Sequence, residues 1–188
     1  MKRITLLFLA FLPLIAHGQT YSSIVSDSTI LAFMKWEIEN GEKFPEDSKL
    51  RIQRKTSSKM LKFDSLNFNI PTNINEIDWQ YDLYFFNRYN KIDTLFSKAD
   101  IDLLFTQFTA LKDTVWSHKI SGAKIKKWKS PMNQYNYSAP IFSNDNQYVL
   151  IQKSFYCGNV CAYGGVYLYK NIGTNKWELL TILNGWMS

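Results

Sequence analysis

The sequence predicts an α+β fold, in which N-terminal and central helices pack on a mainly antiparallel sheet that ends in a C-terminal β-meander. Two observations lead to this prediction. Apolar residues recur at three- and four-residue spacing over residues 28–39 and 98–112, which is typical of amphipathic helices. Residues 147–183 instead form β-branched and aromatic runs divided by turn residues, which is typical of strands. Helices early in the chain and strands late in it indicate an α+β arrangement.

The first helix is expected over Ser28–Glu39. Its apolar positions are Ile30, Phe33, Met34 and Ile38. Ser26 or Asp27 can cap the first turn, because a short polar side chain there accepts hydrogen bonds from free backbone N–H groups. Asn40 and Gly41 can end the helix, because both residues tolerate the left-handed conformation that often follows one.

The second helix is expected over Lys98–Lys112. Ser97 and Asp100 approximate a capping box, with Asp in place of the usual Glu. Its apolar face consists of Ile101, Leu104, Phe105, Phe108 and Leu111. Strands are also predicted over Met60–Phe63, Asp78–Phe86 and Lys124–Lys129.

Three strands are predicted at the C-terminal end, over Gln147–Tyr156, Tyr163–Lys170 and Lys176–Leu183. If Cys157 lies opposite Cys161, the register of the first two strands follows. One face then carries the pairs Phe155/Tyr163, Ile151/Tyr167 and Val149/Tyr169, and the other face carries Leu150/Leu168 and Gln152/Val166. Aromatic–aliphatic cross-strand pairs of this kind stabilise a sheet. The third run adds another antiparallel strand.

Cys157 and Cys161 are the two cysteines of the chain. Across a short hairpin loop they would lie near the ~4.4–6.8 Å Cα separation that a disulfide needs, so we expect a structural disulfide. A redox or metal role is the alternative, but redox pairs use a Cys-x-x-Cys spacing and three residues intervene here. Val160 is ill suited to the left-handed conformation that three-residue hairpin loops often need, so the turn is a place where the register can slip.

The first 18 residues have the pattern of a secretory signal peptide. Two basic residues precede a 12-residue apolar stretch over residues 4–15, and Ala16-His17-Gly18 places small residues before a cleavage site at Gln19. A buried N-terminal helix is the alternative. Twelve residues are too few to span about 30 Å of hydrocarbon, and no second stretch approaches 18 apolar residues. We therefore expect no transmembrane segment in the mature chain. Residues 19–188 are expected to form one exported domain, periplasmic or secreted.

Composition excludes several classes of protein. An apolar share of 46% and a charged share of 20% exclude a disordered or collagen-like chain, and two cysteines exclude a disulfide-dense miniprotein. Loss of the leader removes two basic residues, which lowers the formal net charge from +6 to +4. This small positive charge weakly favours an anionic partner, and together with export it disfavours nucleic acid.

Parts of the C-terminal third resemble known proteins. The segments that carry the resemblance are Ser138-Ala139-Pro140-Ile141-Phe142-Ser143, Cys157-Gly158, Cys161, Tyr167-Leu168-Tyr169 and Lys176-Trp177. They lie within about the last 50 residues and resemble small exported proteins of Gram-negative bacteria that have no established function. The resemblance implies an exported protein and carries over no catalytic residue.

Catalytic and metal sites find little support in the sequence. His118 is the one histidine that remains after cleavage, and the chain has no G-x-S-x-G motif, so a Ser–His–acid site is not indicated. One histidine and two bonded cysteines are also too few for a zinc site. Asn144-Asp145-Asn146 lacks the spacing of a calcium loop and fits a turn better. We expect neither a cofactor nor a metal.

A glycosidase would need two carboxyl groups about 5–9.5 Å apart. The local candidates are Glu37/Glu39, Asp100/Asp102 and Asp78/Asp82. In each of the first two pairs, the two carboxyl groups point in different directions from their helix. In the third pair, the two carboxyl groups would lie about 13 Å apart along a strand. A pair from distant segments, such as Glu37 with Asp82, stays open, and so does a site built on His118.

A basic stretch carries a binding signal. Residues 119–129 hold five lysines beside one tryptophan. Lysines supply charge and an indole ring supplies a stacking surface, so the candidate binding residues are Lys124, Lys126, Lys127 and Trp128. The alternative is a solvated edge strand, which lysines protect from pairing with other strands.

Aromatic residues are abundant, with six Trp, eleven Tyr and thirteen Phe. Those concentrated near the C-terminus are Tyr156, Tyr163, Tyr167, Tyr169, Trp177 and Trp186. Core packing is their expected role, with a binding surface as the alternative.

The sequence as a whole favours a non-enzymatic binding or interaction module of the cell envelope or extracellular space, whose partner is an anionic glycan, an envelope component or a protein. The alternatives are an exported hydrolase, and a structural factor or enzyme inhibitor of the envelope.

Overall fold

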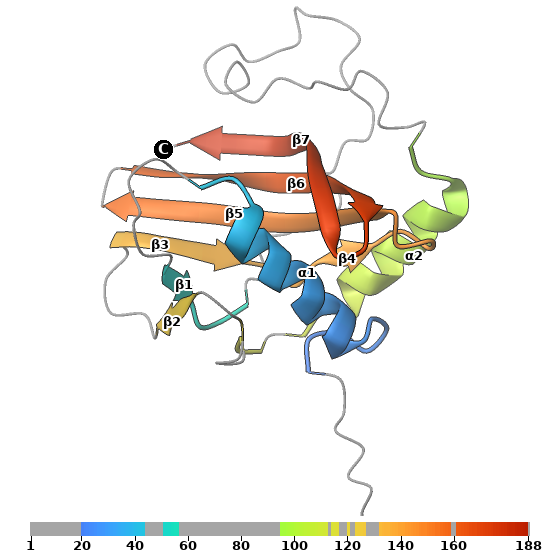
Figure 1. Ribbon diagram of the computed structural model, residues 1–188, viewed down its shortest axis with the longest axis horizontal. Coiled ribbons are helices and arrows are strands. Elements are labelled where there is room, and N and C mark those ends of the chain that lie inside the picture. The colour runs from blue at the N-terminus through green and yellow to red at the C-terminus, as the bar shows by residue number, and fades with distance from the viewer. Residues whose placement is uncertain are drawn as a thin grey trace, which may run out of the picture.

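The computed structural model describes residues 20–43, 51–56, 95–112, 114–116, 120, 123–126, 132–158 and 161–187. The elements in these residues are α1 (Asp27–Asn40), β1 (Arg51–Gln53), α2 (Lys98–Thr109), β2 (Lys124–Lys126), β3 (Met132–Tyr137), β4 (Ile141–Phe142), β5 (Tyr148–Gly158), β6 (Cys161–Gly173) and β7 (Lys176–Met187). They form an α+β fold that is mostly sheet (Figure 1). The predicted signal peptide, the strands predicted at Met60–Phe63 and Asp78–Phe86, and His118 lie outside the described residues.

The strands of the described residues form one mixed sheet in the order β2-β1-β3-β5-β6-β7, with β4 also paired to β5. β1 runs parallel to β2 and β3, and the remaining neighbours are antiparallel. β3 and β4 both pair with the same neighbour, β5. Ser138 bridges these two strands, because its backbone N–H donates to the Gln152 carbonyl and its hydroxyl oxygen accepts from the Gln152 N–H, each at 3.0 Å.

The register predicted between β5 and β6 is confirmed, since all five predicted pairs occur. Cys157 itself does not lie opposite Cys161, because the register shifts after Tyr156 and places Gly158 in that position. The shift falls at the turn where a slip was expected. The two cysteines still form a disulfide, and their Cα atoms are 5.2 Å apart.

The helix α1 has polar caps at both ends. The Ser26 hydroxyl oxygen accepts from the Thr29 N–H at 3.2 Å. At the other end, the Gly41 N–H donates to the Glu37 carbonyl at 2.8 Å. Gly41 has a φ of −63°, so it ends the helix in an extended conformation and not in the left-handed one expected from the sequence. A glycine fits here because a Cβ at this position would overlap the Glu37 carboxylate.

The helix α2 begins with the predicted capping box. The Asp100 N–H donates to the Ser97 hydroxyl oxygen, and the Ser97 N–H donates to the Asp100 carboxylate. The helix ends at Thr109, three residues before the predicted end. Beyond the helix, the Lys112 N–H donates to the Tyr21 carbonyl at 3.2 Å, a contact to a segment before α1.

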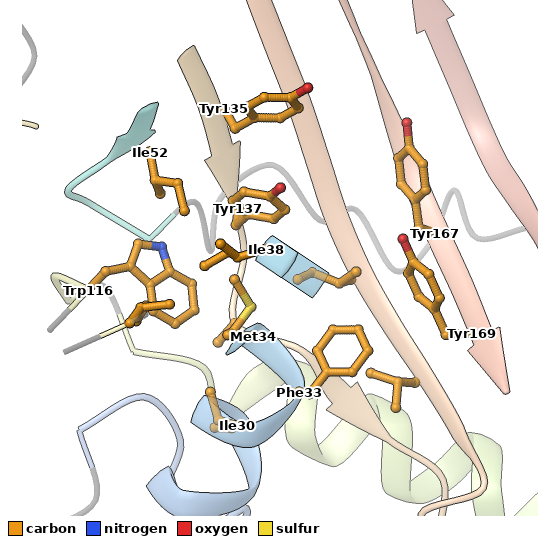
Figure 2. Packing of buried hydrophobic residues seen from close by; sticks show 14 of the residues in the cluster. Ile30, Phe33, Met34, Ile38, Ile52, Trp116, Tyr135, Tyr137, Tyr167 and Tyr169 are labelled. Carbon is orange, nitrogen blue, oxygen red and sulfur yellow. The ribbon is translucent and has the colours of Figure 1, made fainter. Parts of the chain in front are cut away.

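The sheet separates two clusters of buried side chains. The first is largely aromatic and includes α1, the tyrosines of β3 and β6, and the odd-numbered residues of β5 (Figure 2). The second is mainly aliphatic and joins Leu104 of α2 to Leu150, Val166 and Leu168. Figure 1 shows α1 lying across the front of the sheet, over the middle strands.

Candidate functional site

A cleft lies between the C-terminal half of α1 and the turn that joins β6 to β7; we name it the α1–hairpin cleft. Its volume is about 510 Å³, which is within the range of small-ligand sites. It is lined by Ala32, Lys35, Trp36, Glu39, Asn40, Ile172, Asn175, Lys176 and Trp177. Helix periodicity builds one wall, because Ala32, Trp36 and Asn40 are spaced four residues apart on one ridge. The hairpin builds the other wall, with Gly173 paired to Lys176.

The two tryptophans of the cleft are anchored in the aromatic cluster. The ring centroids of Trp36 and Trp177 are 5.5 Å apart and their planes are tilted by 59°. Phe33 packs edge-on against Trp177 at 5.3 Å, and Tyr169 packs edge-on against Trp36 at 5.6 Å. Trp177 is 9% exposed, whereas Trp36 is half-buried. The cleft therefore has an aromatic lining whose position is fixed by core packing.

Polar groups surround these rings. The Asn40 side-chain N–H donates to the Trp36 carbonyl at 3.1 Å. Asn175 has a φ of 53°, a left-handed conformation that asparagine tolerates in tight turns. The charged side chains are Lys35, Glu39 and Lys176; all three are exposed, and none forms an ion pair within the described residues.

A second polar centre lies inside the protein. Lys153 of β5 and Glu37 of α1 are each at most 1% exposed, and Lys153 Nζ lies 2.9 Å from Glu37 Oε1. Lys153 Nζ also donates to the backbone carbonyl of Glu42. Gly41 makes room for the pair, because a Cβ at that position would overlap the Glu37 carboxylate. The ion pair fastens the end of α1 to the middle of the sheet.

Four tyrosines surround this ion pair. Figure 2 shows Tyr135 and Tyr137 of β3 pointing toward Tyr167 and Tyr169 of β6. Lys153 Nζ lies 4.9 Å from the Tyr167 ring centroid and 5.7 Å from that of Tyr135, which are cation–π distances. Within the described part of the chain, the second carboxylate oxygen of Glu37 has no hydrogen-bond partner within 3.5 Å.

The environment raises the pKa of three of these tyrosines. For Tyr137, burial is the main cause and the Glu37 charge is the second. For Tyr167, burial leads and the charges of Glu42 and Glu37 follow. For Tyr169, burial is again the main cause of the raised pKa, and the negative charge of Glu37 is the second. The Tyr169 hydroxyl also lies near the Glu37 carboxylate, although this contact does not meet the geometry of a hydrogen bond. All three hydroxyls therefore stay protonated well into the alkaline range.

The buried ion pair was missed from the sequence, although a signal was present. The predicted register placed odd-numbered β5 residues on one face, and Lys153 falls among them between Ile151 and Phe155. A lysine on a buried face needs an acidic partner. Glu37 lies between the buried Met34 and Ile38 on α1, so its position likewise indicates a buried charge that needs a partner.

The predicted lysine–tryptophan site is only partly described. Lys124 and Lys126 belong to β2, at one end of the sheet order, where they pair with Arg51 and Gln53. Lys127 and Trp128 lie outside the described residues. The described residues place the backbone of a lysine-bearing strand at the end of the sheet order.

Three of the carboxylates considered above, those of Glu37, Asp100 and Asp145, have structural partners. Asp100 accepts hydrogen bonds from Ser97 and from the Asn144 N–H, and these bonds, with Ser97 the larger contributor, lower its pKa. Asp145 accepts from the Ser143 hydroxyl at 2.6 Å and from the Gln147 N–H at 2.9 Å, which confirms a turn there. Glu37 is engaged by Lys153.

Other classes of site are not seen in the described part of the chain. It contains no group of three or more His, Cys, Asp or Glu side chains that could hold a metal ion. Among its helices, none is long and apolar enough to cross a membrane. No protein-family model, curated protein or solved structure matches this chain. Its function is therefore inferred from the geometry of the α1–hairpin cleft.

Proposed function

We propose that the chain is an exported, non-enzymatic binding module of the cell envelope or extracellular space, and that its ligand binds in the α1–hairpin cleft. In this proposal the helices pack on a sheet that ends in a C-terminal β-meander, and the last turn of the meander forms one wall of the site. The observation that carries the proposal is a concave site of about 510 Å³ that is lined by two tryptophans and by charged side chains with no ion-pair partner among the described residues.

The polar groups of the cleft support binding in preference to catalysis. General acid–base or nucleophilic catalysis needs reactive side chains within hydrogen-bond reach of each other or of a substrate held beside them. Among the described residues, one side-chain hydrogen bond joins two residues of the lining, from the Asn40 amide to the Trp36 carbonyl. An asparagine amide does not act as a general acid or base. The Glu37–Lys153 pair is closed to solvent, so it cannot contact a substrate in the cleft.

Export is supported by two features. The first 18 residues have the n-region, apolar stretch and small-residue pattern of a signal peptide. The Cys157–Cys161 pair lies at disulfide distance, and disulfides persist mainly in oxidising compartments.

The proposal is tested with the full chain secreted by a bacterial host. Indole N–H signals and intrinsic fluorescence are followed while neutral and acidic oligosaccharides, extended peptides and anionic lipid vesicles are added. Ligands should perturb the Trp36 signal, and Trp36→Ala should remove their binding. The matched control is Phe105→Ala, which removes a 48% exposed ring from α2 and should leave binding unchanged. Circular dichroism establishes that both variants are folded. Binding that survives Trp36→Ala, or no response to any probe, would overturn the proposal.

A further inference from the structure

The α1–hairpin cleft has the chemistry of a site for one class of ligand. Resting on the binding role proposed above, we infer that it takes an acidic oligosaccharide, a short glycan whose sugar rings carry carboxylate groups. Three features of the cleft carry this inference: the tilt of the tryptophan rings, the amide groups beside them, and the placement of the charges.

The tryptophan geometry selects the shape of the ligand. A tilt of 59° between Trp36 and Trp177 leaves no parallel slot, so a flat base or aromatic ring could stack on one indole at most. A pyranose ring is puckered and presents C–H groups on its faces and hydroxyl groups around its rim. Such a ring packs one face on the exposed part of Trp36, because Trp177 is only 9% exposed and its ring lies against Trp36. Its polar rim then faces the amides and charges around the cleft.

The amide groups match the rim of a sugar. Asn40 uses a side-chain N–H on the Trp36 carbonyl, which fixes the amide beside the indole and leaves its oxygen as an acceptor with no partner in the described residues. Asn175 offers a second amide from the opposite wall. Sugar hydroxyls both donate and accept, so a pair of amides can bind them from two sides.

The charges favour a carboxylate over a neutral sugar. Lys35 lies on α1 and Lys176 lies on the hairpin, so positive charge flanks the tryptophans from both walls. Neither lysine has an ion-pair partner in the described part of the chain. Glu39 lies one helical turn from Lys35 and repels anions, which disfavours a dense polyanion such as a polyphosphate and favours widely spaced carboxylates.

The test uses three uronate probes: oligosaccharides of galacturonate, of mannuronate and of hyaluronan. Cellopentaose is the neutral probe and polyglutamate is the carboxylate probe without sugar. Calorimetry at low salt should show at least one uronate probe binding at least tenfold more tightly than cellopentaose and polyglutamate. Affinity should fall about tenfold in Lys35→Gln and in Lys176→Gln, and should rise in Glu39→Gln. Lys98→Gln, an exposed lysine of α2, is the matched control and should change nothing.

The outcomes separate the ligand class from the binding role. Equal affinity for cellopentaose overturns the acidic requirement, and equal affinity for polyglutamate overturns the sugar requirement. If every uronate fails while a peptide or vesicle perturbs Trp36, the ligand class is wrong and the binding role stands. If none of the probes perturbs Trp36, both proposals are overturned. A weaker affinity in Glu39→Gln would contradict the arrangement of charges.

Discussion

The two faces of the sheet are stabilised by different kinds of interaction. The α1 face buries an ion pair, four tyrosines and edge-on ring contacts, all of which depend on direction as well as distance. The α2 face buries mainly aliphatic side chains, whose packing depends little on direction, together with directional contacts such as the Gln107 hydrogen bonds to Phe142. The tryptophans of the cleft continue the α1-face cluster through Phe33 and Tyr169. We infer that the α1 face fixes the geometry of the cleft, while the α2 face supplies general stability.

The largest expected effect comes from breaking the buried ion pair. Lys153→Met should lower the free energy of unfolding by about 3–5 kcal/mol, because it leaves the Glu37 charge buried and unpaired. The double variant Glu37→Leu/Lys153→Met should recover most of that loss. Urea unfolding followed by circular dichroism measures both.

The matched control is Leu150→Met on the α2 face, which should cost less than about 1.5 kcal/mol, because Leu and Met have similar volume. Equal costs for Lys153→Met and Leu150→Met would remove the contrast between the faces.

The next prediction concerns the hydrogen bonds between Gln107 of α2 and Phe142 of β4. The Gln107 side chain donates to the Phe142 carbonyl at 2.6 Å and accepts from the Phe142 N–H at 2.9 Å. Gln107→Leu leaves both buried backbone groups without these bonds, at about 1–3 kcal/mol for each group. Faster amide exchange at Phe142 should accompany the loss in urea unfolding. Unchanged exchange at this amide would show that another group protects it.

A smaller effect is expected from crowding the ion pair at the end of α1. Gly41→Ala places a Cβ against the Glu37 carboxylate and should cost about 1–3 kcal/mol in urea unfolding. Glu42→Ala is the control, because it retains the backbone carbonyl that Lys153 uses, and it should stay within about 0.5 kcal/mol. A Gly41→Ala variant as stable as the parent would mean that the carboxylate can move away freely.

Alkaline pH should weaken the α1 face selectively. Tyr137, Tyr167 and Tyr169 have raised pKa values in the fold, so above pH ~10 the unfolded chain binds fewer protons than the folded chain. Their contribution is fully present below pH ~10 and is lost as pH rises, by up to about 1.4 kcal/mol per pH unit for each tyrosine. The urea concentration at the midpoint of unfolding should fall as the pH is raised from 9 to 11, and it should fall less steeply in the Tyr137→Phe variant than in the parent protein. Tyrosinate absorbance that develops fully near pH 10 in the folded protein would contradict the raised pKa values.

Local patterns predicted much of the fold. The spacing of Ile30 and Phe33 placed α1, the Ser97–Asp100 pattern placed the start of α2, and alternation gave the register of β5 and β6. These features depend on residues that are close along the chain or opposite each other across one hairpin. The α1–hairpin cleft was not predicted, because no local pattern shows that Trp36 meets Trp177. The lysine–tryptophan stretch, to which the sequence pointed, stays a prediction.

By itself, the sequence determined the helices, the antiparallel register of the C-terminal strands and the spacing of the cysteines, because neighbouring residues set each of them. Tertiary structure alone decided which buried charges meet: Glu37 and Lys153 are 116 positions apart, and either could have been solvent-exposed. It also decided the parallel pairing of β1 and the assembly of the α1–hairpin cleft. Contacts of this kind form when distant segments bury their surfaces against each other, and no local period records which surfaces will meet.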